Sequence, residues 1–339
     1  MSRRIGIDAI NLKATPRLAH TEYCDHDPLV RKVQADTGRS FADAWDYDLV
    51  WLTDDGPVSW GAVGRVTDMG HAEFAEGGVD RREAKPCPFT DPEQVLAFDA
   101  VEEYGLVDFD ELVAYCDASH RRSLAAFPGQ VVPGGYYKTL VSGAIESFGW
   151  EMLLAAAADR DGFERVLDSF FRLTLHHVKA WAKTPIEVFI CHDDMVWSEG
   201  PFVHPDFYRK AIFPRYAALW KVLRDAGKKV LFCSDAKWTM FVDDIAAAGA
   251  DGFIFEPMTS LDEVVAKYGR THVIVGSKVD CRTLAFKGID EIRAEIDATL
   301  ELAFNCPGFF CAVGNHIPAN VPIENAEFYI KYLQEHWRR

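Results

Sequence analysis

Short apolar runs alternate with longer segments of helical periodicity through the second half of the chain. A continuous apolar run bounded by polar residues is typical of a strand buried on both faces. Strands that alternate with helices indicate a parallel sheet covered by helices. The predicted strands lie at 187–194, 226–235, 249–257, 271–281 and 308–316, and the helices between and after them include 204–226, 289–305 and a last one from residue 323.

Each of these strands ends in polar side chains. The strand ends are His192-Asp193-Asp194, Cys233-Ser234-Asp235, Glu256, Asp280-Cys281 and Asn315-His316. A barrel gathers the carboxyl ends of all its strands at one mouth, whereas a doubly wound sheet gathers them only near its switch point. Because the polar ends follow one another on consecutive strands, the pattern favours an α/β fold of the (β/α)₈ TIM-barrel type.

The first half of the chain is less regular and supplies the remaining three strands. We expect the first at 17–23, ending in His20, Glu22 and Tyr23. The second is expected at 47–56, ending in two aspartates, and the third at 127–140, with Tyr136 and Tyr137 near its end. Residues 57–90 contain glycines and charges, which predict an inserted hairpin over the mouth. Helices are expected at 93–104, 109–124, 150–158 and 161–182.

Length and charge limit the classes of protein that this chain can belong to. Its 339 residues, 49% of them hydrophobic, suit a single (β/α)₈ barrel over 1–339. The net charge of −16 disfavours nucleic acid and anionic membrane as partners. The sequence shows neither a signal peptide nor a run of 18 apolar residues, so we expect a soluble, cytosolic protein. Its eight cysteines form no CxxC pair and are expected to be reduced thiols, mostly in the core.

The strand ends also carry a candidate metal site, formed by Cys233, Asp235, Glu256, Cys281 and His316. The spacing from Asp235 to Glu256, and onward to Cys281 and His316, is about one strand-helix unit per step. Thiolate, imidazole and carboxylate groups together suit zinc. The alternative is that Asp235 and Glu256 cap helices or bind loops, and that the two cysteines pack in the core.

Several motifs in order resemble the uroporphyrinogen decarboxylase superfamily. They are HDDMVWSEGPFVHPDFYRKAIFPRY, GKKVLFCSD, GADGFIFEP, VDCRTLAFKGIDEIRAEI and GNHIPANVPIEN, and they cover about 190–327. The resemblance implies a single barrel. It also implies one of two activities, decarboxylation or zinc-dependent methyl transfer to or from a corrinoid or coenzyme M. The barrel of cobalamin-independent methionine synthase is similar in site layout.

The two branches of the superfamily imply different residues. The decarboxylase holds substrate carboxylates with arginines near the first strand, but this strand carries His20, Glu22, Asp25 and Asp27 beside Arg17. The methyltransferases carry His-x-Cys after the fifth strand and Cys after the eighth. Here Cys233-Ser234-Asp235 and Asn315-His316 stand at those places, and Glu256 resembles the glutamate zinc ligand of the methionine synthase. Site layout is therefore closest to the zinc-dependent corrinoid methyltransferase branch.

The resemblance implies that zinc acts as a Lewis acid on a small methylated substrate, expected to be a methoxylated aromatic. The acceptor would be cobalamin on a separate corrinoid protein. His192, Asp193 and Asp194 are the candidate catalytic residues, although the two aspartates could instead cap a helix. The candidate substrate-binding residues are His20, Glu22, Tyr23, Tyr136 and Trp197.

Two other functions stay open at this level, and so does the oligomeric state. The chain could be a decarboxylase or lyase acting on a small acid, or a barrel that binds a metabolite without catalysis. Zinc content separates the zinc-dependent methyltransferase from a metal-free lyase. A homodimer is possible.

Overall fold

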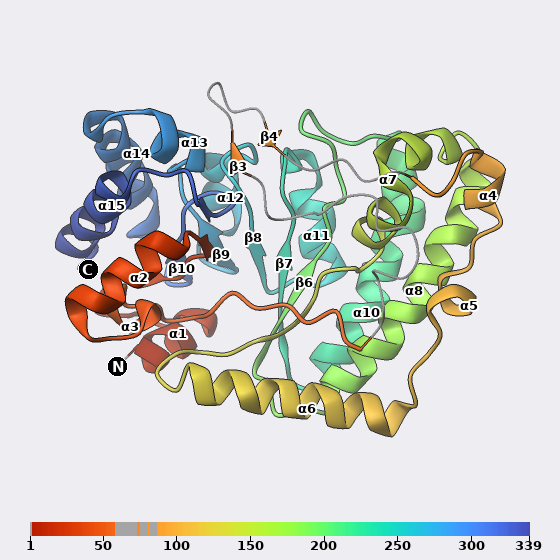
Figure 1. Cartoon of the computed structure of the whole chain (residues 1–339), viewed down its shortest axis with the longest axis horizontal. Helices are drawn as coiled ribbons and strands as arrows, with labels where there is room; N and C mark the ends of the chain where they lie inside the picture. Colours follow the sequence, from red (N-terminus) through yellow and green to blue (C-terminus); the bar gives the residue numbers. More distant parts are fainter. Residues whose placement is uncertain (1, 58–72, 75–79, 82–86) are drawn as a thin grey trace.

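The computed structural model describes residues 2–57, 73–74, 80–81 and 87–339. Its centre is a seven-stranded parallel sheet in the order β1-β10-β9-β8-β7-β6-β5. In Figure 1, β6 to β10 run through the middle, with α14 and α15 on one side and α8 and α10 on the other. The strands are β1 (Ala19–His20), β5 (Gly134–Tyr136), β6 (Val188–His192), β7 (Lys229–Cys233), β8 (Gly252–Ile254), β9 (Val273–Gly276) and β10 (Phe309–Cys311).

Residues 48–54 close this sheet into a barrel. On one side the Asp48 amide donates to the His20 carbonyl over 2.8 Å. On the other side the Val50 amide donates to the Val131 carbonyl over 3.0 Å, and the Asp54 amide to the Gly135 carbonyl over 3.1 Å. The segment therefore lies between β1 and β5 as the eighth strand, and the predicted (β/α)₈ fold is confirmed.

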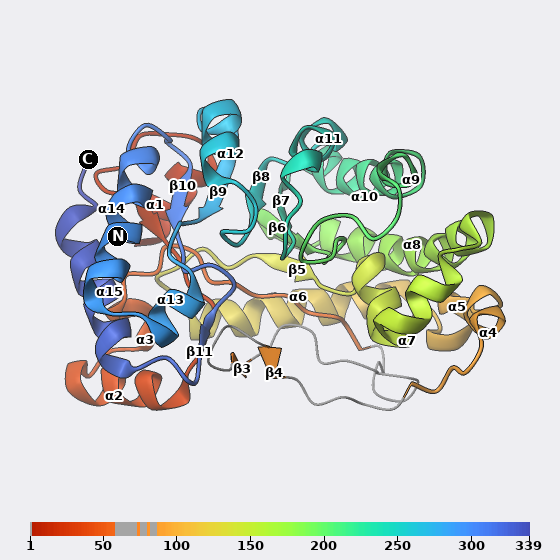
Figure 2. The ribbon, with the colours of Figure 1, turned by 90° about the horizontal axis from the view of Figure 1, so that it is seen from above.

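Helices follow the strands and surround them, as the view from above shows (Figure 2). The helices in the first half are α1 (Ser2–Ile10), α2 (Asp27–Thr37), α3 (Phe41–Ala44), α4 (Pro92–Leu96), α5 (Ala100–Tyr104), α6 (Phe109–Ala126), α7 (Val141–Ala156) and α8 (Arg160–Ala182). The second half contains α9 (Pro205–Phe207), the π-helical turn η1 (Tyr208–Ile212), α10 (Phe213–Asp225), the 3₁₀ turn η2 (Thr239–Phe241), α11 (Val242–Ala248), α12 (Leu261–Tyr268), α13 (Cys281–Phe286), α14 (Ile289–Ala303) and α15 (Ile323–His336).

The strands separate two hydrophobic cores. Successive side chains of a strand point to opposite faces, so alternate residues enter the barrel interior. The inner core contains Leu231, Val275 and Phe310, and it also contains Ile5 and Ala9 of α1, so α1 plugs the barrel. The outer core lies between the strands and the helices and includes the intervening strand residues. A residue's parity along its strand therefore decides whether it faces the barrel interior.

Two predicted helices differ from the structure. The helix predicted at 150–158 begins instead at Val141. Its first turn is capped by the carboxylate of Asp193, which follows β6, a contact between distant parts of the chain that local sequence does not reveal. The helix predicted at 93–104 is two short helices, because the Asp99 side chain accepts hydrogen bonds from two following amides and starts α5 anew.

The predicted insertion at 57–90 falls mostly outside the described residues. Within it, β3 (Glu73–Phe74) pairs antiparallel with β4 (Asp80–Arg81), as expected for a hairpin. Two further short strands, β2 (Cys24–Asp25) and β11 (Ile317–Pro318), pair in parallel. None of the helices in the described part of the chain is long and apolar enough to cross a membrane.

Candidate functional site

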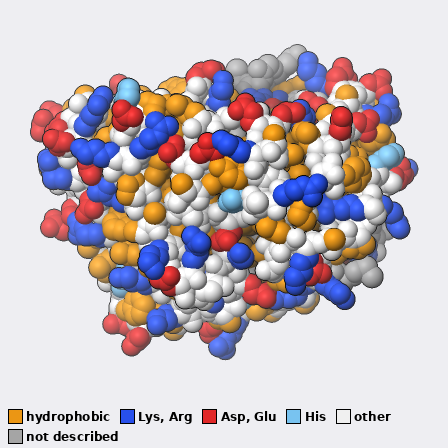
Figure 3. Space-filling model, turned by 180° about the vertical axis from the view of Figure 1, so that it is seen from behind, with side chains coloured by type: hydrophobic (Ala, Val, Ile, Leu, Met, Phe, Trp, Pro, Cys, Tyr) orange, Lys and Arg blue, Asp and Glu red, His pale blue; other side chains and the backbone are white. Residues whose placement is uncertain are grey.

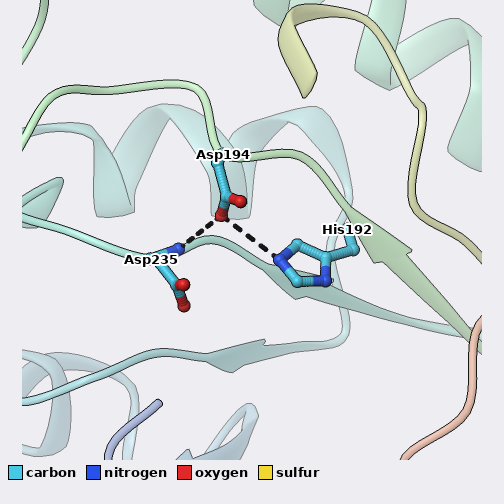
Figure 4. Close-up of side chains that lie close together, drawn as sticks. All are labelled: His192, Asp194 and Asp235. Atoms are coloured by element: carbon cyan, nitrogen blue, oxygen red, sulfur yellow. Dashed lines mark hydrogen bonds and ion pairs between the residues drawn. The ribbon is translucent and has the colours of Figure 1, made fainter. Parts of the chain in front are cut away.

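His192, Asp194 and Asp235 form the one group of possible metal ligands found among the described residues (Figure 4). One ligand atom from each lies within 4.8 Å of the others. His192 Nε2 donates to Asp194 Oδ1 over 3.2 Å, and the Asp235 amide donates to the same oxygen over 2.9 Å. His192 is the last residue of β6 and Asp235 follows β7, so two neighbouring strand ends build this triad.

Charge around Asp194 keeps its carboxylate ionised. Burial raises the pKa of Asp194, but the neighbouring His192, the Asp235 amide and the Tyr137 hydroxyl lower it by more, and the net pKa is below the usual value. An ionised carboxylate beside an imidazole can bind a divalent cation or hold a proton on the imidazole.

The backbone around Asp235 adopts an unusual conformation. Ala236 has a φ of 68° and Asn315 has a φ of 68°, the left-handed region that L residues rarely occupy. The Ala236 amide donates to Glu256 Oε1 over 2.6 Å, and Asn315 Nδ2 donates to Asp235 Oδ2 over 2.9 Å. The strained backbone therefore coincides with the contacts that fix Asp235, as is common where a site must be held rigid.

Tyr137 completes the surroundings of the triad. Its ring stacks on the His192 ring with 4.1 Å between centroids, and its hydroxyl donates to Asp194 Oδ2 over 3.1 Å. The sequence did place Tyr137 near a strand end, but the predicted substrate residue was Tyr136. Successive side chains of a strand face opposite sides, and the sequence QVVPGGYY does not show which of the two tyrosines faces the barrel interior.

Tyr136 and Asp193 have the opposite parity and point into the outer layer. Tyr136 is fully buried, and its ring stacks on His177 with 4.9 Å between centroids. The Asp193 carboxylate accepts hydrogen bonds from three amides at the start of α7, including Ser142 at 2.6 Å, and from the Tyr216 hydroxyl at 2.6 Å. Asp193 thus caps α7, a helix that precedes its own strand in the sequence.

His20 and Glu22 also face the outer layer. His20 Nε2 lies 3.0 Å from Glu22 Oε1, and the same oxygen accepts a hydrogen bond from the Tyr329 hydroxyl of α15 over 2.6 Å. Glu22 Oε2 accepts from the Val313 amide over 2.8 Å. These contacts place both side chains between the barrel wall and α15 rather than at the mouth.

The two candidate cysteine ligands are both buried. Cys233 belongs to the inner core, below Asp235, and burial raises the pKa of its thiol far above the usual value. Cys281 is the first residue of α13 and packs in the outer core, where burial likewise raises its pKa. Neither thiol belongs to the group formed by His192, Asp194 and Asp235.

Glu256 and His316 lie close to the triad but outside the group of three. Glu256 follows β8 and is buried, and burial raises the pKa of its carboxyl, while the Ala236 amide and Arg282 act in the opposite direction. His316 is buried, and its ring meets Tyr23 with 6.0 Å between centroids. Tyr23 in turn lies 6.1 Å from Trp51, so aromatic rings gather on this side of the mouth.

Trp197 is not part of the group of three and is 45% exposed. It follows Asp194 by three residues in a tight turn, in which the Trp197 amide donates to the Gly200 carbonyl over 2.7 Å. Its ring packs edge-on against Trp150 of α7 with 5.2 Å between centroids. Gly149, with a φ of 73°, bends α7 just before Trp150.

The donor set of the triad fits zinc. One imidazole nitrogen and two carboxylate oxygens are ligand types that Zn²⁺ accepts, and three protein ligands leave a position for water or substrate. Asp194 is buried, whereas His192 and Asp235 are partly exposed, so the group opens toward solvent on one side.

Comparisons with known proteins agree with this architecture. Residues 139–336 match the sequence profile described as uroporphyrinogen decarboxylase (URO-D). No curated protein sequence matches the chain. A solved methyltransferase from Methanosarcina mazei superposes with a TM-score of 0.66 at 15% identity, covering 98% of each chain. A B12-independent methionine synthase from Shewanella sp. W3-18-1, in complex with selenomethionine, gives a TM-score of 0.45 at 8% identity, covering 95% of this chain and 94% of that one. At these identities, structural likeness establishes the fold alone.

Proposed function

The chain belongs to the uroporphyrinogen decarboxylase family, and on that premise we propose that it is a zinc-dependent methyltransferase. It would move a methyl group from a small methylated substrate, a methoxylated aromatic in the first instance, to cobalamin on a separate corrinoid protein. The observation that carries the proposal is the triad of His192, Asp194 and Asp235 at the carboxyl end of the barrel strands. In barrels of this type that end holds the active site.

His192, Asp194 and Asp235 would hold the zinc ion. When bound, zinc supplies a Lewis acid that stabilises the oxygen from which the methyl group departs. Tyr137 and Asn315 orient the ligands, through the hydrogen bonds of 3.1 Å to Asp194 and 2.9 Å to Asp235. Supporting contacts of this kind fix the geometry of metal ligands in proteins.

The aromatic rings near the triad support an aromatic substrate. Tyr23 and Trp51 pack near each other, and Tyr137 stacks on His192. Flat apolar surfaces beside a few polar groups are typical of sites that bind small aromatic molecules.

The charges near the triad argue against a substrate with several carboxylates. Asp194, Asp235 and Glu256 are all acidic. Two basic side chains in the neighbourhood are engaged with carboxylates, since Lys138 pairs with Glu146 and Arg282 with Asp280 over 2.8 Å. A porphyrinogen decarboxylase requires cations for its substrate, so methyl transfer suits these residues better.

A metal-free lyase is the second candidate function. The hydrogen bond between His192 Nε2 and Asp194 Oδ1, 3.2 Å long, is the observation that favours it. An imidazole oriented by a carboxylate can transfer protons without a metal ion.

Elemental analysis of the protein, purified without chelator and without added metal, tests the choice between them. About one zinc per chain supports the methyltransferase and justifies assays with 2-methoxyphenol and a reduced corrinoid protein. A protein that remains metal-free after zinc is offered at neutral pH would exclude the proposal and leave the lyase.

A further inference from the structure

A buried group of charges stands behind Tyr137. Lys138 and Glu146 are 3% and 1% exposed and form an ion pair, and Asp55 Oδ2 lies 3.7 Å from Lys138 Nζ. Lys138 belongs to the segment after β5, and Glu146 to α7. The pair therefore joins the third barrel strand to the following helix.

Removing two charges from water costs several kcal/mol per ion, and their mutual attraction often fails to offset it. A buried ion pair is thus weak evidence for stability by itself, and its neighbours show what else it does. Here the neighbour that Lys138 contacts is the aromatic ring of Tyr137.

Lys138 and Asp55 hold Tyr137 from two directions. Lys138 Nζ lies 4.3 Å from the centroid of the Tyr137 ring, in a cation–π contact. The Tyr137 amide donates to Asp55 Oδ1 over 3.2 Å. The same ring stacks on His192 at 4.1 Å, and its hydroxyl reaches Asp194 at 3.1 Å. Two members of the triad thus touch one tyrosine, which the buried charges keep in place.

We propose that Lys138, fixed by Glu146 and Asp55, is a positioning residue that holds Tyr137 against His192 and Asp194, so that the triad is arranged for a metal ion before the ion arrives. The inference rests on the proposed metal site but not on methyl transfer. It assigns to the Lys138–Glu146 pair a role in metal affinity, which a merely structural ion pair would not have.

The test compares metal binding in the unmodified protein and three variants. Because Lys138→Met alone would leave Glu146 unpaired, the variant is Lys138→Met with Glu146→Leu, which removes both charges together. Asp55→Asn is a milder second variant, since Asp55 is partly exposed. The control is Lys221→Met, which breaks an exposed ion pair with Asp225 on α10.

The readouts are the dissociation constant for Zn²⁺ and the visible absorption spectrum with Co²⁺, each beside the thermal unfolding midpoint. Loss of a residue that supports a metal ligand typically weakens affinity by about 10–100-fold, and we expect that range for the double variant with an altered Co²⁺ spectrum. Asp55→Asn should show the same changes to a smaller degree, and Lys221→Met neither.

The outcomes distinguish this inference from the proposed function. Zinc affinity and a Co²⁺ spectrum equal to those of the unmodified protein, in both the folded double variant and Asp55→Asn, would overturn the positioning role alone. If the double variant does not fold, Asp55→Asn decides by the same criteria. Failure of the unmodified protein to bind either metal would overturn both.

Discussion

Asp235 is the residue on which the metal site most depends. It comes from a different strand than His192 and Asp194, and Asn315 and the turn at Ala236 fix it from both sides. Its carboxylate completes the three ligands, so the site should not survive its replacement.

We expect Asp235→Asn to weaken zinc binding by more than about 100-fold, because loss of a supporting residue alone costs about 10–100-fold. Zinc retained per chain after dialysis measures this. Affinity of the unmodified protein should also fall as the pH is lowered, since the ligands must be deprotonated. Asp225→Asn, an exposed change on α10, is the matched control, and equal zinc content in both variants would remove Asp235 from the ligand set.

His177 gives the protein a sensitivity to acid that is independent of the metal site. Its ring is buried against Tyr136, and its Nδ1 has no partner among the described residues. Burial, with a smaller contribution from His176, lowers the pKa of His177 to about 4. In the folded state His177 therefore stays neutral at pH values just below 6.5, where the same side chain of the unfolded chain takes up a proton.

A depressed histidine pKa stabilises the fold above about pH 6.5, and that contribution is lost as the pH falls toward 4. The loss amounts to about 3 kcal/mol at 1.36 kcal/mol per pKa unit. His177→Phe keeps a ring against Tyr136 and should flatten this slope, measured by urea unfolding between pH 4 and 7.5. The exposed change His204→Phe should leave the slope intact, and an unchanged slope in His177→Phe would refute the assignment.

At the scale of elements, strand alternation separates the site residues from the structural ones. His192 and Asp194 have the inward parity of β6, and Asp193 between them has the outward one. Polarity near a strand end, taken without this parity, groups Tyr136 and Glu22 with the site. The segment QVVPGGYY shows no period-two alternation of apolar and polar residues, so only the structure separates Tyr137 from Tyr136.

The contact between Asp193 and α7 carries a prediction at this scale. The carboxylate accepts from the amides of Leu140, Val141 and Ser142, at 3.2, 3.2 and 2.6 Å. Asp193→Ala should reduce the free energy of unfolding by about 3 kcal/mol, because it leaves several buried donors without an acceptor. Urea denaturation measures this, with the exposed Asp225→Ala as control. A loss of activity without destabilisation would instead favour a direct catalytic role.

At the scale of the whole molecule, charge limits partners and substrates. On the face shown in Figure 3, Lys and Arg side chains are interspersed with Asp and Glu rather than gathered in one stripe. The net charge is −16, and residues 57–86 contain four basic and five acidic residues, so the insertion does not offset the acidic side chains near the triad. A long-range negative potential repels anions and is screened by salt.

We therefore expect the protein to prefer neutral substrates over carboxylated ones of the same shape. 2-Methoxyphenol should bind at least about 10-fold more tightly than 4-hydroxy-3-methoxybenzoate at low ionic strength, since one repelled charge is worth about 1 kcal/mol or more near a surface. The difference should shrink as salt is added. Titration calorimetry on the metal-free protein, where no zinc adds positive charge to the site, measures both, and tighter binding of the benzoate would contradict the charge argument.

The sequence by itself determined the barrel and the end of it that bears the polar residues. Apolar runs at regular spacing specify strands and helices, and the polar strand ends converge because parallel strands share one direction. Three of the predicted site residues, His192, Asp194 and Asp235, come together in the structure.

Only the tertiary structure decided which polar side chains meet. Cys281 begins a helix and turns into the outer core, Asp193 caps a helix formed by residues far away in the sequence, and Asn315 reaches across the mouth to Asp235. These contacts join residues 50 to 80 positions apart or depend on where a strand stops. Local propensity and residue spacing do not reveal such contacts, because the packing between helices and strands determines them.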